Sequence, residues 1–324
     1  MSSLQDSHKL LIVIGLAVAV AFPLVINNNF YIDILTLILF SAFLGQSWNI
    51  LGGYAGQFSF GGVVFFGTGA YASSILMETY SIDPWIGIFA AIFAGAIMGM
   101  LIGFISFRYG LKGSYFALIT LAFAEFFRVI ANSVEFTGGG AGIFIDHEPS
   151  LARLQFQDPS GYYYLALIMT VISLLVAWWL KQSRFGARLV AIRENEDAAK
   201  ALGVNVFRCK MYAIIISGAM GGAAGTFYAQ KFLYLDPPIA FGVDISVEML
   251  LVTIVGGLGT VFGPLLGAFV LHGISELARH FLEAPGLSLM VYGAILVLII
   301  GFLPNGLIGA FSRFGKKKKD NKDA

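Results

Sequence analysis

Two glutamates lie inside long apolar stretches of the sequence, where a charged side chain needs either a partner or a function. Glu125 precedes Arg128 by three residues, so the two side chains share one face of a helix and can pair. Glu248 follows Asp244 and Ser246 at the start of another apolar stretch. We predict that Glu125 and Glu248 line a pathway across a membrane. Two alternatives stay open: an ion pair that only satisfies itself for Glu125, and an interfacial or structural role for Glu248.

Glycines at four-residue spacing form a regular pattern in the chain. The rows are Gly95, Gly99 and Gly103; Gly218 and Gly222; Gly221 and Gly225; and Gly259, Gly263 and Gly267. In lipid such rows let helix backbones approach closely, so they predict helix packing. Two clusters, 52–59 and 256–263, combine glycine with polar residues and predict either broken helices at the cytoplasmic ends of crossings or simple turns. Within the first cluster, Tyr54, Gln57 and Ser59 are predicted to line the pathway.

The sequence lacks the patterns that carry catalysis or bind a cofactor. The only Gly-Lys pair, Gly315-Lys316, has neither the following Ser or Thr nor the upstream glycine of a nucleotide-binding loop. The four histidines fall in no metal-ligand spacing, and the single cysteine, Cys209, cannot build a zinc site. No helix carries the chain of acids and histidines that a proton-driven pump requires. We therefore predict no enzyme activity, no metal and no bound cofactor, and a source of energy in another protein.

The composition is that of a membrane protein. Hydrophobic residues make up 58% of the 324 residues and charged residues 12%, and the mean hydropathy is +0.82. Apolar runs long enough to cross about 30 Å of hydrocarbon as helices begin near Leu10, Ile32, Phe58, Trp85, Ser114, Tyr163, Met211 and Leu287. Two shorter runs between Ile245 and Gly273 are predicted to form two crossings or a re-entrant pair. The predicted fold is all-α and polytopic, with about ten transmembrane helices in one domain over 1–315 and a basic tail over 316–324.

Basic residues predict the orientation, because Lys and Arg near helix ends are retained in the cytoplasm. Fifteen of the twenty Lys and Arg residues lie in 181–210, in 313–322 and at Arg108 and Lys112. The connections over 78–83 and 135–158 are mostly acidic and are predicted to lie outside. Both termini are then cytoplasmic, and the four lysines of 316–319 face membrane lipid.

One long polar island, Lys181–Lys210, interrupts the apolar sequence. Its apolar residues recur at helical spacing and predict the buried side of a short amphipathic helix: Leu189, Ile192, Ala199, Leu202 and Val206. Asn195 is predicted to cap the second half of this helix, and Gly203 to end it. A charged cytoplasmic helix can serve as the contact through which another protein moves the membrane domain, and we predict this role for the polar island. The alternative is that the island is a solvated connecting loop.

Six motifs occur in the order of one family of membrane proteins. They are W-N-I-L-G-G-Y-A-G-Q-F-S-F-G from Trp48, F-F-G-T-G-A-Y from Phe65, L-K-G-S-Y-F-A-L-I-T-L-A-F-A-E from Leu111, T-G-G-G-A-G-I from Thr137, F-G-A-R-L-V-A-I-R-E-N-E-D-A-A-K-A-L-G-V from Phe185 and G-G-L-G-T-V-F-G-P-L-L-G-A from Gly256. Over Trp48–Leu271 the chain resembles the inner-membrane permeases of branched-chain amino-acid ABC importers, specifically the LivM branch.

The resemblance implies a membrane subunit that pairs with a second, related permease and with two cytoplasmic ABC ATPases, which hydrolyse the ATP. An extracytoplasmic solute-binding protein would deliver the solute, and no nucleic acid takes part. Ala191–Gly203 resembles the coupling segment that enters a cleft of the ATPase, with Asp197 where glutamate is commoner. The residues implied in ATPase coupling are Arg188, Arg193, Glu194, Glu196, Asp197, Ala198, Ala199, Lys200 and Gly203.

The implied function is translocation of branched-chain amino acids across a bacterial-type inner membrane, by alternating access that the partner ATPases drive. Sister permeases for urea and short amides share much of this framework. Gly62 stands where relatives often have a polar residue, so these solutes stay open as an alternative. A second alternative is a self-sufficient, ion-coupled carrier that uses Glu125 or Glu248 as its ion site.

Overall fold

Helices make up most of the described part of the protein. The structure, a computed structural model, describes residues 2–26 and 28–281 and the positions 290, 293–294, 297–298, 301–302 and 306–309. In chain order the elements are α1 (Ser2–Val25), α2 (Asn29–Asn49), the π-helical η1 (Ile50–Tyr54), α3 (Gly62–Tyr80), α4 (Pro84–Arg108), α5 (Gly113–Ser133), the 3-10 turns η2 (Glu135–Thr137) and η3 (Gly139–Ala141), β1 (Ile143–Phe144), α6 (Pro159–Gln182), α7 (Arg184–Glu194), α8 (Glu196–Ala201), α9 (Val206–Phe232), β2 (Tyr234–Leu235), α10 (Pro237–Phe241), α11 (Val243–Gly256) and α12 (Gly263–Phe281). The predicted all-helical fold is confirmed.

Several of these helices are suited to a membrane. Among the described residues, six helical stretches are long and apolar enough to cross one: Asn29–Tyr54, Pro84–Arg108, Gly113–Ser133, Pro159–Gln182, Val206–Phe232 and Pro237–Gly256. The predicted run from Leu287 is described only at isolated positions, and the basic tail 316–324 lies outside the described residues. The polytopic membrane class follows, whereas the count of ten crossings stays a prediction.

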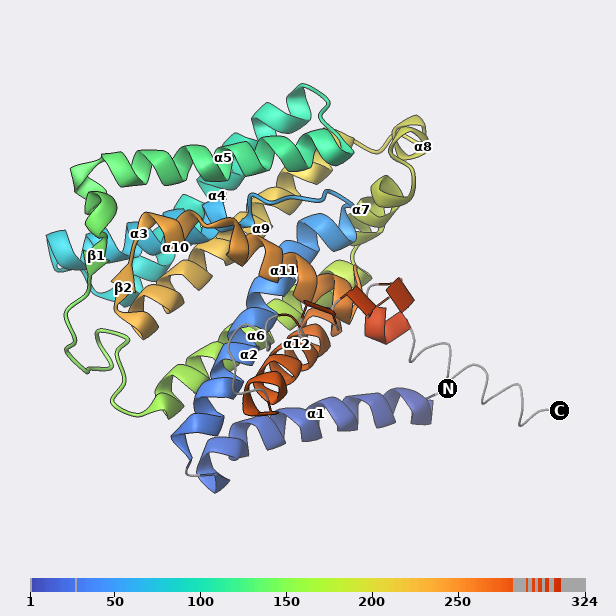
Figure 1. Cartoon of the computed structure of the whole chain (residues 1–324). Coiled ribbons are helices and arrows are strands. Elements are labelled where there is room, and N and C mark those ends of the chain that lie inside the picture. The colour runs from blue at the N-terminus through green and yellow to red at the C-terminus, as the bar shows by residue number, and fades with distance from the viewer. Residues whose placement is uncertain are drawn as a thin grey trace.

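Glycine rows bring the central helices together. In α9, a side chain added at Gly222 would overlap the carbonyl of Ala91 in α4, and one at Gly225 would overlap the carbonyl of Phe66 in α3. The two glycine rows of α9 therefore face two different neighbours, α4 and α3. Figure 1 shows these three helices in the same part of the bundle. Because lipid tails are as apolar as leucine, such backbone contact and not hydrophobic burial holds the helices together. The predicted packing role of these rows is confirmed.

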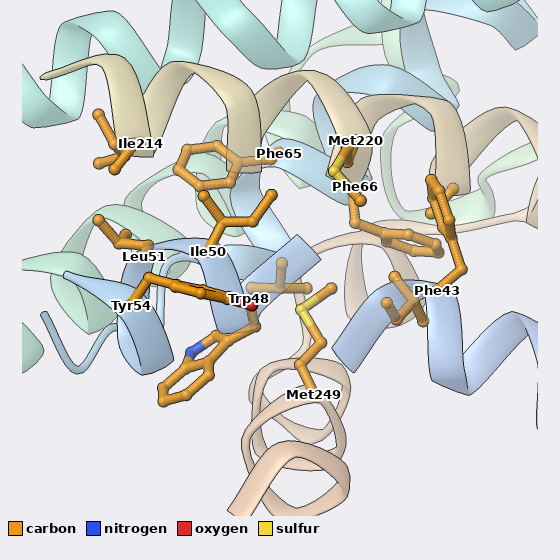
Figure 2. Packing of buried hydrophobic residues seen from close by; sticks show 14 of the residues in the cluster. Phe43, Trp48, Ile50, Leu51, Tyr54, Phe65, Phe66, Ile214, Met220 and Met249 are labelled. Atoms are coloured by element: carbon orange, nitrogen blue, oxygen red, sulfur yellow. The ribbon is translucent and has the colours of Figure 1, made fainter. Parts of the chain in front are cut away.

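A dense aromatic core lies between α2, α3, α9 and α11. Figure 2 shows Ile50 and Leu51 of η1 surrounded by side chains from three other helices: Phe65, Phe66, Ile214, Met220 and Met249. Trp48 is 2% exposed, and its indole nitrogen donates to the carbonyl of Ser59 at 2.7 Å. This bond ties the end of α2 to the chain that leads into α3, so the first glycine cluster is anchored in packed surroundings.

The two ends of the bundle differ. At one end β1 pairs with β2 antiparallel, with Ile143 opposite Leu235, which joins the connection after α5 to the connection after α9. At the other end lie α7, α8 and the turn between α4 and α5 (Figure 1). Prolines at the first helical positions, where no backbone N–H is needed, start α4, α6 and α10.

Candidate functional site

The polar island forms two short helices. The side chain of Ser183 accepts a hydrogen bond from Gly186 N at 3.0 Å and starts α7, and Asn195 accepts one from Ala198 N at 2.9 Å and starts α8. Gly203 follows α8 with a φ of +84°, in the left-handed region that favours glycine. The predicted cap at Asn195 and the predicted end at Gly203 are confirmed. We call α7 and α8 together, Arg184–Ala201, the α7–α8 unit.

The apolar side of the α7–α8 unit faces the bundle, with one exception. Leu189, Ile192 and Ala199 are buried, as predicted. Leu202 was expected on the same side but is 85% exposed. The expectation was wrong because it assumed one continuous helix, whereas Asn195 is extended between α7 and α8 and Leu202 caps the end of α8. Val206, the last residue expected on this side, is half-buried and already belongs to α9.

Most of the predicted coupling residues lie on the outer surface of this unit. Exposed side chains are those of Arg188, Glu194, Asp197, Ala198 and Lys200, and Gly203 is exposed as well. Ala199 is buried, and Arg193 and Glu196 reach back to the bundle. The outer surface thus combines both signs of charge with the apolar Leu202.

Arg193 connects the α7–α8 unit to both glycine clusters. Its Nη1 donates to the carbonyl of Gly53 at 2.8 Å, and Nη2 donates to Glu194 at 2.7 Å. A side chain added at Gly56 would come 2.7 Å from Cγ of Arg193, and one added at Gly259 would come 2.6 Å from Nη1. The guanidinium therefore occupies the place where the two clusters meet, and only glycine leaves room for it.

Asn49 joins the two clusters directly. Its Oδ1 accepts from Gly259 N at 2.8 Å, and its Nδ2 donates to the carbonyl of Thr260 at 2.9 Å. The first cluster forms η1 and an irregular segment before α3, and the second forms the link between α11 and α12. Both predicted interruptions are present, and their free backbone groups bind Arg193 and Asn49. We call this group of contacts the Arg193 junction.

A charge cluster holds the other side of the α7–α8 unit. Glu196 lies 2.6 Å from Nζ of Lys210 in α9 and 3.2 Å from Nζ of Lys112, in the turn before α5. The Lys210 side chain is 3% exposed and also lies over the ring of Phe107, 5.5 Å from its centroid. The hydrogen bond to Glu196 raises the pKa of the Lys112 ammonium. This contribution to stability is present at neutral pH and is lost only as the pH rises through that raised pKa.

The predicted pathway residues of the first cluster are buried. Tyr54 donates from its hydroxyl to the carbonyl of Ala177 at 3.3 Å, and Gln57 donates to the carbonyl of Ala55 at 3.1 Å. Ser59 accepts from Gly61 N at 3.0 Å. These bonds satisfy polar atoms of all three side chains, whereas Oε1 of Gln57 is buried without a partner among the described residues. Contact with a solute stays a prediction.

The two intramembrane glutamates have different surroundings. Glu125 accepts from Nε of Arg128 at 2.9 Å, so the predicted pair within α5 is confirmed. Glu248 accepts a hydrogen bond from Ser41 of α2, and Nε2 of His272 in α12 lies 3.4 Å from its carboxylate. His272 also lies 2.7 Å from the Ser41 hydroxyl, so this cluster joins three helices.

Comparison with known proteins agrees with the motifs. A family model described as "Branched-chain amino acid transport system / permease component" matches residues 30–300. The chain belongs to this permease family. The permease is 32% identical to the high-affinity branched-chain amino acid transport system permease protein LivM of Escherichia coli (strain K12), over 93% of this chain and 75% of the relative. The resemblance to LivM-type permeases is confirmed.

Other relatives carry other names. The permease is 26% identical to the L-arabinose ABC transporter permease protein AraH of Azospirillum brasilense, over 72% of this chain and 68% of the relative. It is also 26% identical to the probable branched-chain amino acid transport permease protein LivH of Methanocaldococcus jannaschii, over 72% of this chain and 75% of the relative. No solved structure matches the chain.

Sequence analysis did not identify three residues that make polar contacts in the permease: Asn49, Ser41 and His272. Asn49 stands three residues before Gly52, the first residue of the first glycine cluster, and this position was the available signal. Ser41 and His272 lie in apolar runs far from Glu248 in the chain, so no local pattern relates them to it.

The charge cluster predicts a stability difference between neighbouring acids. Glu196→Gln is expected to lower the free energy of unfolding by about 3 kcal/mol, because it leaves the buried Lys210 ammonium without a carboxylate. Thermal unfolding of the purified permease in detergent measures this loss. The matched control is Asp197→Asn, because Asp197 is 88% exposed and lies 3.6 Å from Lys112. Its expected effect is below about 0.5 kcal/mol, and equal losses in the two variants would contradict the prediction.

Proposed function

We propose that this permease is the membrane subunit of an ABC importer that translocates branched-chain amino acids by alternating access. One observation carries the proposal: the α7–α8 unit exposes a charged surface outward and is fixed inward to the Arg193 junction. A partner ATPase that moves this unit would displace both interruptions of the membrane helices together. In this proposal the ATP is hydrolysed by the partners, and the permease has no catalytic site of its own.

Two attachments make the α7–α8 unit suitable for transmitting movement. Arg193 binds the carbonyl of Gly53 in η1, and Glu196 binds Lys112 and Lys210 near the ends of α4, α5 and α9. Movement of the unit would therefore reach η1, the turn before α5 and the start of α9. Irregular chain segments absorb such movement more easily than regular helices, because few backbone bonds must change.

The solute and the partners follow from the relatives. The LivM relative is more similar than AraH, so we propose a branched-chain amino acid and not a sugar as the solute. The similarity to LivH supports a second, related permease as partner in a heterodimer. Two ABC ATPases at the α7–α8 end and a solute-binding protein at the β1–β2 end complete the proposed importer. The α7–α8 end and both chain termini would be cytoplasmic, with the tail near membrane lipid.

The proposed pathway runs past the polar residues near the interruptions and within the helices: Tyr54, Gln57, Ser59, Glu125 and Glu248. Phenylalanine-rich packing around them suits an aliphatic solute that is held weakly. The choice of solute would then be made mainly by the binding protein.

Purification from the native membrane in mild detergent tests the proposal. We expect mass spectrometry to find a related permease and two ABC ATPases with the tagged chain. Replacing Ala198, Lys200 and Leu202 on the outer surface with aspartate should release the ATPases and retain the second permease, because these residues lie away from the bundle. The complex in proteoliposomes, with its binding protein, should take up leucine and not urea or arabinose. A chain that purifies alone and transports with an ion gradient would overturn the proposal.

A further inference from the structure

Helix α5 carries an ion pair on a surface that the rest of the chain leaves open. Its 21 residues span roughly 30 Å, the thickness of the hydrocarbon layer. Figure 1 shows α5 at the edge of the bundle. Glu125 lies near the middle of the helix, and the side chains of Glu125 and Arg128 are 52% and 41% exposed. Among the described residues, they form hydrogen bonds and ion pairs only with each other.

The exposed surfaces of two other helices are different. Between Trp85 and Phe104, α4 exposes only apolar large side chains: Trp85, Ile86, Phe89, Phe93, Ile97, Met100, Leu101 and Phe104. On α6 the exposed residues before Lys181 are Ile168, Ile172, Leu175, Trp178 and Trp179. These two surfaces suit lipid tails. The open surface of α5 also carries large apolar side chains: Tyr115, Leu118, Phe126, Val129 and Ile130. It differs from α4 and α6 in the ion pair beside them, because a charged pair at this depth is costly in hydrocarbon.

The ion pair belongs to a polar strip along one side of α5. Spacings of three, four and seven residues put Ser114, Leu121, Glu125, Arg128 and Asn132 on the same side of the helix. The opposite boundary is the buried row that packs against the bundle: Phe116, Thr120, Ala124 and Ala131. The strip combines four polar side chains with the half-buried Leu121 and runs beside the exposed Leu118. It can therefore offer both charged and aliphatic contacts to a solute.

We propose that Glu125 and Arg128 bind the charged groups of a zwitterionic α-amino acid as it passes along α5. This inference rests on the proposed function and adds the site at which the solute is held. Arg128 donates to Glu125 from Nε and Nη2, which leaves Nη1 for the carboxylate of the solute. The ammonium of the solute binds the Glu125 carboxylate, which accepts several hydrogen bonds at once. Leu121, one turn earlier, contacts the aliphatic side chain.

The charges of the site and the solute are complementary. The solute lies antiparallel to the ion pair, so neither charge of the pair is left without a partner. A neutral sugar gains nothing from this arrangement, whereas a zwitterion exchanges its water for two ionic contacts. Glu248 is a less suitable site, because Ser41 and His272 already bind its carboxylate.

Neutral variants of the pair test this inference in the complete importer. Leucine uptake is measured in proteoliposomes that contain the permease, its partner permease, the ATPases and the binding protein. Glu125→Gln and Arg128→Gln are each expected to lower uptake by at least about tenfold. ATPase stimulation by the binding protein and protein abundance should change less than about twofold. The control is Glu148→Gln, which breaks an exposed ion pair with Arg153 in the connection before α6 and should leave uptake unchanged.

The double variant Glu125→Gln/Arg128→Gln separates the solute site from a structural ion pair. If the pair binds solute, the double variant stays as defective as the single variants. If the pair only satisfies itself, removing both charges restores uptake, and the inference is overturned. Full uptake in the single variants would overturn it as well. An importer of native sequence that moves no leucine would instead contradict the proposed function.

Discussion

Arg193→Ala is expected to reduce leucine uptake by the complete importer at least about tenfold while the ATPases remain bound and active. The guanidinium links the α7–α8 unit to the carbonyl of Gly53 and occupies the space beside Gly56 and Gly259. Without the Arg193 guanidinium, the ATPases still move the α7–α8 unit, but the movement no longer reaches the two glycine clusters. ATP hydrolysis without transport is the expected signature. Uptake and ATPase rate, measured on the same proteoliposomes, give the ratio that reports this loss of coupling.

Two further variants show whether the position of the charge matters. Glu194→Ala removes the surface partner of Arg193. Because the Glu194 side chain is 68% exposed, this variant should leave coupling within about twofold of the native importer. Arg193→Lys keeps the charge but presents a single ammonium in place of the planar fork, so partial activity is expected. If Arg193→Ala transports as well as Glu194→Ala, the junction does not carry the movement.

Gly95→Leu is expected to prevent α4 from packing against α9. A side chain at Gly95 would overlap the carbonyl of Gly218, and one at Gly218 would overlap the carbonyl of Gly95, so the two backbones are in direct contact. Overpacking of this kind costs about 2 kcal/mol or more, which lowers the ratio of folded to unfolded protein by a factor of about 30. Size-exclusion chromatography of detergent extracts measures the folded fraction.

The control for this variant is a glycine with open surroundings. Nothing lies within 4 Å of a side chain added at Gly15 in α1, so Gly15→Leu should fold normally. The same substitution then tests contact and not the loss of glycine as such. Normal yield of Gly95→Leu would show that α4 can move away from α9 without loss of the fold.

Local sequence patterns predicted much of this protein. Hydropathy predicted a helical membrane domain, because a helix in lipid satisfies its own backbone groups and depends on its own stretch of chain. The cap at Asn195, the end at Gly203 and the pairing of Glu125 with Arg128 were predictable for the same reason: each involves residues at most four apart or one backbone angle. The motifs of the family were also visible in the sequence and agree with the matched range 30–300.

Only the tertiary structure decided how distant segments meet. Arg193 binds Gly53 across 140 residues of chain, and Glu248 binds Ser41 across 207. The sequence showed two glycine clusters, but their contact through Asn49 depends on how α2 and α11 pack. Leu202 fits the apolar periodicity of a single helix and is nevertheless exposed, because the segment forms two helices separated at Asn195 and Leu202 caps the end of the second. Periodicity within one helix carries no information about which helices become neighbours, and in this protein that arrangement determines which charges have a partner.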